Sequence, residues 1–129
     1  MKIGIVGSRE RSGPMTVGLI ANAFDSWKER SGIGSPDNPY EYGDIIIVSG
    51  GGDGVDKIAE SFAQARGLPI FIYNPDWKLY GKYAGPMRNT FIAKESDVLI
   101  AAPLPDSKGT RDTMGKFRKY HPDGELIEV

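Results

Sequence analysis

The stretch Ser49-Gly50-Gly51-Gly52-Asp53-Gly54-Val55-Asp56 decides the fold, because it connects an apolar run to a helical pattern. The apolar run is Asp44-Ile45-Ile46-Ile47-Val48, and the helical pattern begins at Val55. Glycines let the backbone turn sharply and approach a ligand closely, and the first turn of a helix offers unpaired N–H groups. A strand, a glycine turn and a helix in this order predict an anion site, most often for phosphate.

The rest of the chain repeats this alternation of strand and helix. Apolar runs predict strands over residues 2–7, 44–49, 69–73, 97–101 and 125–129. Helices are expected from Pro14 to about Arg30, from Val55 to Gly67, from Pro86, and after Gly109-Thr110. This order predicts an α/β fold in one domain, 1–129: a Rossmann-like parallel sheet of about five strands with helices on both faces.

Periodicity also predicts which helical residues face the core and which segments are loops. Residues 31–43 and the aromatic-rich residues 74–85 are expected to be loops. The expected inward-facing residues are Val17, Ile20, Phe24 and Trp27, then Val55, Ile58, Ala59, Phe62 and Ala65, then Met87 and Phe91, and finally Met114 and Phe117.

Composition limits the functions that the chain can have. Its 129 residues carry a formal charge of −1, contain no cysteine and include one histidine, His121. Disulfides and thiolate chemistry are therefore excluded, and no metal site or cofactor is expected. The balance of charge gives no reason to expect a nucleic-acid partner. The apolar start is too short for a membrane span and lacks a cleavage pattern, so we expect a cytoplasmic protein.

Several polar segments should meet at one edge of the sheet. Open parallel sheets bind ligands at the carboxyl ends of their strands, where Gly7-Ser8-Arg9, the 49–56 turn, the 74–85 loop and Gly109-Thr110 are expected. Arg9 can hold a phosphate or be a solvated loop residue. Arg88 in the first turn of its helix opposes the helix dipole, which favours a role with an anionic partner.

Two further groups of residues leave alternatives open. Asp53 and Asp56 suit either helix capping or contact with ribose hydroxyls. Trp77, Tyr80 and Tyr83 can stack on a base, cover an edge of the core or form a contact between copies, and we expect a homo-oligomer. The glycine turn matches neither the dinucleotide pattern G-x-G-x-x-G nor the P-loop, which disfavours dehydrogenases and P-loop ATPases.

The motifs, taken in order, resemble the YspA-like branch of the SLOG superfamily, which also includes lonely-guy phosphoribohydrolases and the DNA-processing Smf proteins. The resemblance rests on Gly7-Ser8-Arg9, the 49–56 turn, Pro75-Asp76-Trp77, Gly81-Lys82-Tyr83-Ala84-Gly85-Pro86-Met87-Arg88-Asn89 and Gly109-Thr110. It implies a Rossmann-like domain that senses, binds or processes nucleotide-derived molecules such as ADP-ribose, often in conflict between bacteria and phages.

One position departs from the catalytic pattern of the lonely-guy enzymes, G-T-x-x-E. The place of the glutamate is taken by Thr113. Asp112 is one residue short, and one residue on a helix is a rotation of about 100°. The resemblance therefore favours binding of a phosphorylated ribonucleoside, plausibly ADP-ribose, cyclic ADP-ribose or another NAD-derived signal. The alternative is a hydrolase that cleaves an N-glycosidic or phosphoester bond, with Asp53, Asp56 or Asp112 activating water.

The predicted ligand-binding residues come from the strand ends, the aromatic loop and the two later helix starts. They are Gly7, Ser8, Arg9, Ser49, Gly50, Gly51, Gly52, Asp53, Gly54, Asp56, Asp76, Trp77, Lys82, Arg88, Asn89, Gly109 and Thr110.

Overall fold

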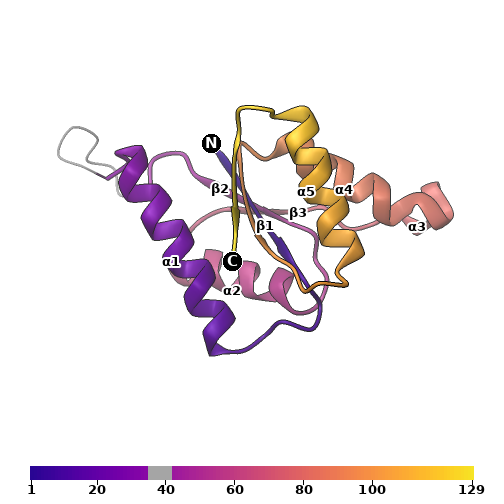
Figure 1. The fold of residues 1–129 in the computed structure, drawn as a ribbon, viewed down its shortest axis with the longest axis horizontal. Coiled ribbons are helices and arrows are strands. Elements are labelled where there is room, and N and C mark those ends of the chain that lie inside the picture. The colour runs from indigo at the N-terminus through magenta and orange to yellow at the C-terminus, as the bar shows by residue number, and fades with distance from the viewer. Residues whose placement is uncertain (35–41) are drawn as a thin grey trace.

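A parallel sheet of five strands forms the centre of the computed structural model, which describes residues 1–34 and 42–129 (Figure 1). The strand order is β3-β2-β1-β4-β5, and each neighbouring pair is parallel. The prediction of a Rossmann-like parallel sheet is thereby confirmed. The strands are β1 (Lys2–Gly7), β2 (Ile46–Ser49), β3 (Ile70–Ile72), β4 (Val98–Ala102) and β5 (Glu125–Glu128).

Helices cover both faces of this sheet, as expected. The longer ones are α1 (Pro14–Ser31), α2 (Val55–Arg66), α4 (Ala84–Glu95) and α5 (Lys108–Tyr120). One buried cluster joins α1 and α2 to the sheet through residues such as Phe24 and Ile58. A second cluster joins α4 and α5 to the opposite face through residues such as Ile92 and Phe117. Figure 1 shows the two helix pairs on opposite sides of the strands.

Three residues expected to face the core are instead exposed. Val17 is 46% exposed and Phe91 is 38% exposed, and Ala65 also lies on the surface. Thr16 is buried where Val17 was expected, and Ala63 is buried where Ala65 was expected. The other predicted residues of α1 and α2 are buried as expected, so in these two helices the difference is confined to one position, which the packing against the sheet decides.

Residues 74–85 are largely helical, which corrects the prediction of a loop. They contain the short helix α3 (Trp77–Tyr80) and the 3₁₀ turn η1 (Gly81–Tyr83). The Asp76 side chain caps α3 by accepting a hydrogen bond from the Leu79 N–H at 3.0 Å. The next helix, α4, begins at Ala84 rather than Pro86, because a proline is tolerated anywhere in a first turn whose N–H groups have no acceptor. Most of the predicted 31–43 loop lies outside the described residues.

The sheet order creates a crevice between β1 and β4. The chain proceeds from β1 to β2 and β3 on one side and returns to β4 on the other side of β1. The carboxyl ends of these two strands meet where Gly7 pairs with Ala102. In open α/β sheets such a reversal of strand order is where ligands bind.

The loop after β1 is pinned against the start of α2. The Val55 N–H donates to the Ser8 carbonyl oxygen at 3.1 Å, and Gly54 is the N-cap of α2 with φ +67°. A Cβ on Gly54 would overlap the Ser8 carbonyl oxygen and would lie 2.5 Å from the Arg9 carbonyl carbon. Both the positive φ and the absence of space therefore require glycine here.

We predict that Gly54→Ala destabilises the protein by about 2–4 kcal/mol, through backbone strain and overlap with backbone atoms that cannot move away cheaply. Gly67→Ala is the comparison: Gly67 also has φ +67°, but its ψ of 27° lies in the left-handed helical region whereas that of Gly54 is −121°, and nothing lies within 4 Å of its missing Cβ. The control should cost only the strain, about 1 kcal/mol. Urea unfolding measures the free energy of unfolding of both variants. An equal decrease in the two would refute the contribution from overlap with the Ser8 and Arg9 backbone.

Candidate functional site

A cavity of about 250 Å³ opens at the carboxyl ends of β1 and β4, at the crevice between them. Its wall combines the loop after β1, the glycine turn, the first half of α4 and the start of α5. The lining residues are Val6, Gly7, Ser8, Arg9, Glu10, Gly50, Gly52, Asp56, Arg88, Asn89, Ile92, Asp106, Ser107, Gly109, Thr110 and Thr113.

Two arginines face this cavity from different elements. Arg88, on α4, donates from Nη1 to the Gly50 carbonyl oxygen at 2.6 Å and from Nε to Asn89 Oδ1 at 3.0 Å. A guanidinium has five N–H groups, so three of them remain for a ligand. Arg9 is exposed and makes no hydrogen bond or ion pair to residues 1–34 and 42–129. Together they offer unused charged donors of the kind that bind phosphate in a fork.

Burial and mutual repulsion act on Arg88. Burial lowers the pKa of its guanidinium, the negative charge of Asp56 raises it, and the positive charge of Arg9 lowers it. An arginine stays protonated in proteins even so. The two cations therefore lie close enough to repel each other, and a bound anion between them would relieve that repulsion.

Asp56 lies within the glycine turn, and its carboxylate already occupies part of that turn. Oδ2 accepts the Gly52 N–H at 3.0 Å, and Oδ1 lies 3.2 Å from Ser49 Oγ. Burial raises the pKa of Asp56, while the Gly52 N–H, the charge of Arg88 and the Ser49 hydroxyl lower it. No side chain caps α2, so Asp53 does not act as its cap. The turn thus already holds a carboxylate of the protein itself. A ligand phosphate would need N–H donors other than that of Gly52.

The start of α5 supplies such donors. The N–H groups of Gly109 and Thr110 have no acceptor within the described parts of the chain, and no side chain caps this helix. Unpaired N–H groups and the positive end of a helix dipole favour an anion. Thr113, one turn later, is 2% exposed, and its hydroxyl donates to the Gly109 carbonyl oxygen at 3.1 Å. It has no acidic group to offer as a catalyst.

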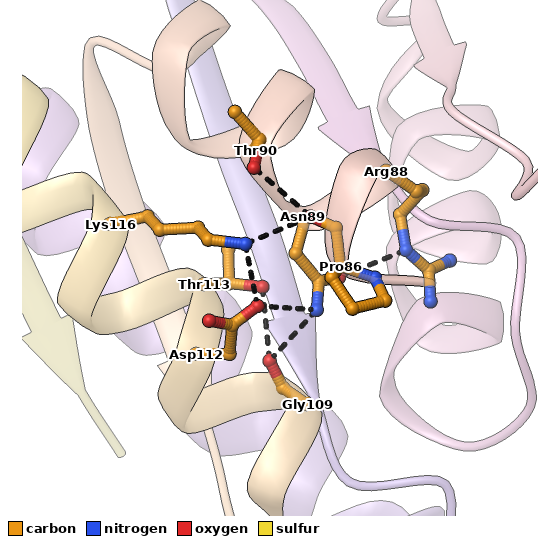
Figure 2. A network of polar contacts seen from close by, with 8 residues as sticks. All are labelled: Pro86, Arg88, Asn89, Thr90, Gly109, Asp112, Thr113 and Lys116. Carbon is orange, nitrogen blue, oxygen red and sulfur yellow. Dashed lines mark hydrogen bonds and ion pairs between the residues drawn. The ribbon is translucent and has the colours of Figure 1, made fainter. Parts of the chain in front are cut away.

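Asp112 points away from the cavity, as its place on the helix predicts. It is not a lining residue, and its Oδ2 accepts hydrogen bonds from Asn89 Nδ2 at 3.2 Å and Lys116 Nζ at 2.9 Å. Figure 2 shows it between these two side chains, on the side of Asn89 opposite Arg88. Of the three aspartates considered for water activation, only Asp56 faces the cavity.

The structure brings most of the predicted site residues together around this cavity. Gly7, Ser8, Arg9, Gly50, Gly52, Asp56, Arg88, Asn89, Gly109 and Thr110 line it. Four others do not line the cavity. Ser49 contacts Asp56, Gly51 packs against Asn74, and Gly54 packs against Ser8, whereas Asp53 lies exposed. Their roles toward a ligand stay predictions.

Asp76, Trp77 and Lys82 lie elsewhere, in and beside α3 and η1, and none of them lines the cavity. Trp77 is 59% exposed and Tyr83 is 62% exposed, with Lys82 Nζ 5.3 Å from the centre of the Tyr83 ring. Base stacking and a contact between copies both stay predictions for these aromatics.

The sequence reasoning missed three polar residues that line the cavity. Glu10 follows Arg9 in the loop after β1, and Asp106 and Ser107 precede α5. All three lie just beyond the carboxyl ends of β1 and β4, so the rule that places ligands at strand ends could have identified them. Glu10 and Asp106 add two carboxylates to the cavity wall, which can accept hydrogen bonds from hydroxyl groups.

Within residues 1–34 and 42–129, histidine, aspartate and glutamate side chains do not gather in threes that could hold a metal ion. In the same ranges, none of the helices combines the length and apolar character that a membrane span requires.

Comparisons with known proteins identify the family of the chain. The model of the YspA, cpYpsA-related SLOG family matches residues 12–80, which include α1 and the glycine turn. The "Gene 61 protein" of Mycobacterium phage D29 is 33% identical over 103 residues, covering 72% of this chain and 82% of that protein. The search of solved structures gives no match. The chain therefore belongs to the YspA, cpYpsA-related SLOG family.

Proposed function

We propose that the cavity binds a phosphorylated ribonucleoside, and that the protein senses or sequesters an ADP-ribose-like signal, linear or cyclic, derived from NAD. Membership of the SLOG family supports a nucleotide-related function. The observation that carries the proposal is the meeting of Arg9, Arg88 and the unpaired N–H groups of α5 around one cavity. A role in conflict between phages and bacteria is part of this proposal through the family resemblance alone; the similar phage protein carries a name that states no function.

The parts of the ligand correspond to two kinds of group in the cavity wall, N–H donors and carboxylates. Arg9, Arg88 and the start of α5 would hold the phosphates. The carboxylates of Glu10, Asp56 and Asp106 would accept hydrogen bonds from ribose hydroxyls. A volume of about 250 Å³ is below the roughly 300–1,000 Å³ of pockets that enclose a drug-sized ligand. The cavity would therefore enclose the ribose-phosphate part and leave the base at its mouth.

Hydrolysis of the ligand is the second candidate, because Asp56 places a carboxylate with a raised pKa in the cavity. Binding alone is favoured because Thr113 stands at the position of the lonely-guy glutamate and its hydroxyl is engaged by Gly109. Incubating ADP-ribose, cyclic ADP-ribose, NAD and nucleoside monophosphates with excess protein, followed by chromatography, separates the two. Intact ligand argues against hydrolysis. Hydrolysis is shown by linear ADP-ribose from the cyclic form, AMP and ribose 5-phosphate from ADP-ribose, nicotinamide from NAD, or a free base from a nucleoside monophosphate.

We predict that Arg9→Ala weakens binding of ADP-ribose about tenfold, because one charge-assisted hydrogen bond to phosphate is lost at an exposed position. Isothermal titration measures the dissociation constant. The free energy of unfolding should not change, since Arg9 makes no bond within the described residues. Arg118→Ala, an exposed arginine of α5 outside the cavity, is the control. Wild-type protein that binds none of these nucleotides would refute the proposed function.

The pH dependence of binding follows from Asp56. Its pKa is raised in the folded protein, mainly by burial. This carboxyl group therefore stabilises the fold fully below its unfolded pKa, and that contribution is lost as the pH rises through the folded pKa. A bound phosphate adds negative charge nearby and raises the same pKa further. Binding is then accompanied by proton uptake, and the affinity should fall as the pH rises.

We predict that the affinity of the wild-type protein for ADP-ribose falls as the pH rises above the ordinary range of an aspartate carboxyl group, because Asp56 then loses its proton while the pyrophosphate of the ligand keeps a constant charge. Asp56→Asn cannot ionise, yet its amide oxygen can still accept the Gly52 N–H. This variant should show a flat pH profile and bind more tightly than wild type at the upper end. Titration calorimetry in buffers of different ionisation enthalpy counts the protons. A wild-type affinity that increases with pH would contradict the assignment.

A further inference from the structure

The Asn89 side chain has a single possible orientation in its surroundings. Its Nδ2 donates to the Gly109 carbonyl oxygen at 3.3 Å and to Asp112 Oδ2 at 3.2 Å, while its Oδ1 accepts from Arg88 Nε. Reversing the amide would set its oxygen against two other oxygens and its nitrogen against a donor. Asn89 is 8% exposed, so water cannot readily replace these partners.

Two bonds fix the plane of the Arg88 guanidinium. Its Nε donates to Asn89 Oδ1 on α4, and its Nη1 donates to the Gly50 carbonyl oxygen in the glycine turn. A flexible arginine loses side-chain entropy when it binds a ligand. Because Arg88 is already held in one plane, its remaining N–H groups meet an incoming anion with less of that loss.

Asp112 is the charged group that anchors this arrangement from outside the cavity. Its Oδ2 accepts both the Asn89 amide and the Lys116 ammonium, and Lys116 also donates to the Pro86 carbonyl oxygen at 2.9 Å. Lys116 therefore ties α5 to the first turn of α4. Figure 2 shows the chain of contacts running from Lys116 through Asp112 and Asn89 to Arg88.

We propose that Asp112 is a positioning residue for ligand recognition: through Asn89 it holds the Arg88 guanidinium in the plane that receives the ligand's phosphate. This inference rests on the proposed function of the cavity. It also gives a role to an acidic residue that lies one position from the lonely-guy glutamate and does not face the cavity. Asp112 acts on the arginine that binds, and not on the ligand.

The first test needs no ligand. In the free protein, the Arg88 Nε–H signal is identified by its loss in Arg88→Lys, and its NMR order parameter and exchange with water are measured. We expect Asp112→Ala to lower the order parameter and speed exchange. Asp112→Asn should keep both near wild type, because a single oxygen accepts both bonds and asparagine retains one oxygen.

Two further variants separate positioning from a general loss of stability. Glu95→Ala removes the Lys2–Glu95 ion pair, and the exposed fraction of the Glu95 side chain, 44%, is close to the 38% of Asp112. It should leave the Arg88 signal unchanged. Lys116→Met removes one of the two donors to Asp112 and should loosen Arg88 in the same direction as Asp112→Ala, but less. If Asp112→Ala does not fold, Lys116→Met tests the positioning role of Asp112 in its place.

The second test uses ADP-ribose in a double-mutant cycle. We expect Asp112→Ala to raise the dissociation constant about fivefold in the wild-type background and to leave it unchanged in the Arg88→Ala background. Asp112→Asn should restore most of the affinity.

The outcomes distinguish the two proposals. An Arg88 signal that is unchanged in Asp112→Ala overturns the positioning role, whatever the protein binds. An equal loss of affinity from Asp112→Ala with and without Arg88 overturns it as well. If wild-type protein binds no phosphorylated nucleotide, the proposed function fails, and the role of Asp112 in recognition fails with it. In that case a loosened Arg88 signal still shows that Asp112 holds the side chain.

Discussion

The contacts of Ser8 are the constraint on which the site depends. Its N–H donates to the Ala102 carbonyl oxygen at 3.1 Å, and its carbonyl oxygen accepts the Val55 N–H at the same distance. One buried residue thus joins the end of β1 to the end of β4 and to the start of α2. These three elements carry the loop with Arg9, the approach to α5 and the glycine turn. Backbone hydrogen bonds at Ser8 therefore hold these parts of the cavity wall together, and a side chain that displaces the Ser8 carbonyl oxygen, as a Cβ on Gly54 would, disturbs the arrangement.

The glycine turn does something different from a simple phosphate loop. Its Gly52 N–H is taken by Asp56, and Gly50 leaves room for the Arg88 guanidinium, since a Cβ there would lie 2.6 Å from Nη1. The missing side chains therefore make space for a carboxylate and an arginine of the protein itself. In the function proposed above, the arginines and the start of α5 would recognise phosphate, and Asp56 would make the charge of the site depend on pH.

Local patterns were sufficient to predict the sheet, the two layers of helices and most of the cavity wall, because each depends on apolar periodicity or on strand ends. They failed where partners distant in sequence decide the outcome. Thr16 and Ala63 are buried in place of Val17 and Ala65 because the packing against the sheet sets the helical phase. The helix in 77–80 depends on the cap from Asp76, and the pairing of Asn89 with Asp112 joins residues 23 positions apart. No periodicity in one segment reports such contacts.

The difference between binding and catalysis comes down to one helical position. A carboxylate at residue 113 would stand in the cavity wall beside the start of α5, where it could reach a reacting atom, but threonine stands there and bonds to Gly109. The carboxylate at residue 112 is rotated out of the cavity and bonds to Asn89 and Lys116. In the roles proposed above, placing the charge one residue earlier would turn an acid that could act on the ligand into a support for the arginine that would hold it. The same helix start can thus serve either chemistry, according to which of its two successive positions carries the acid.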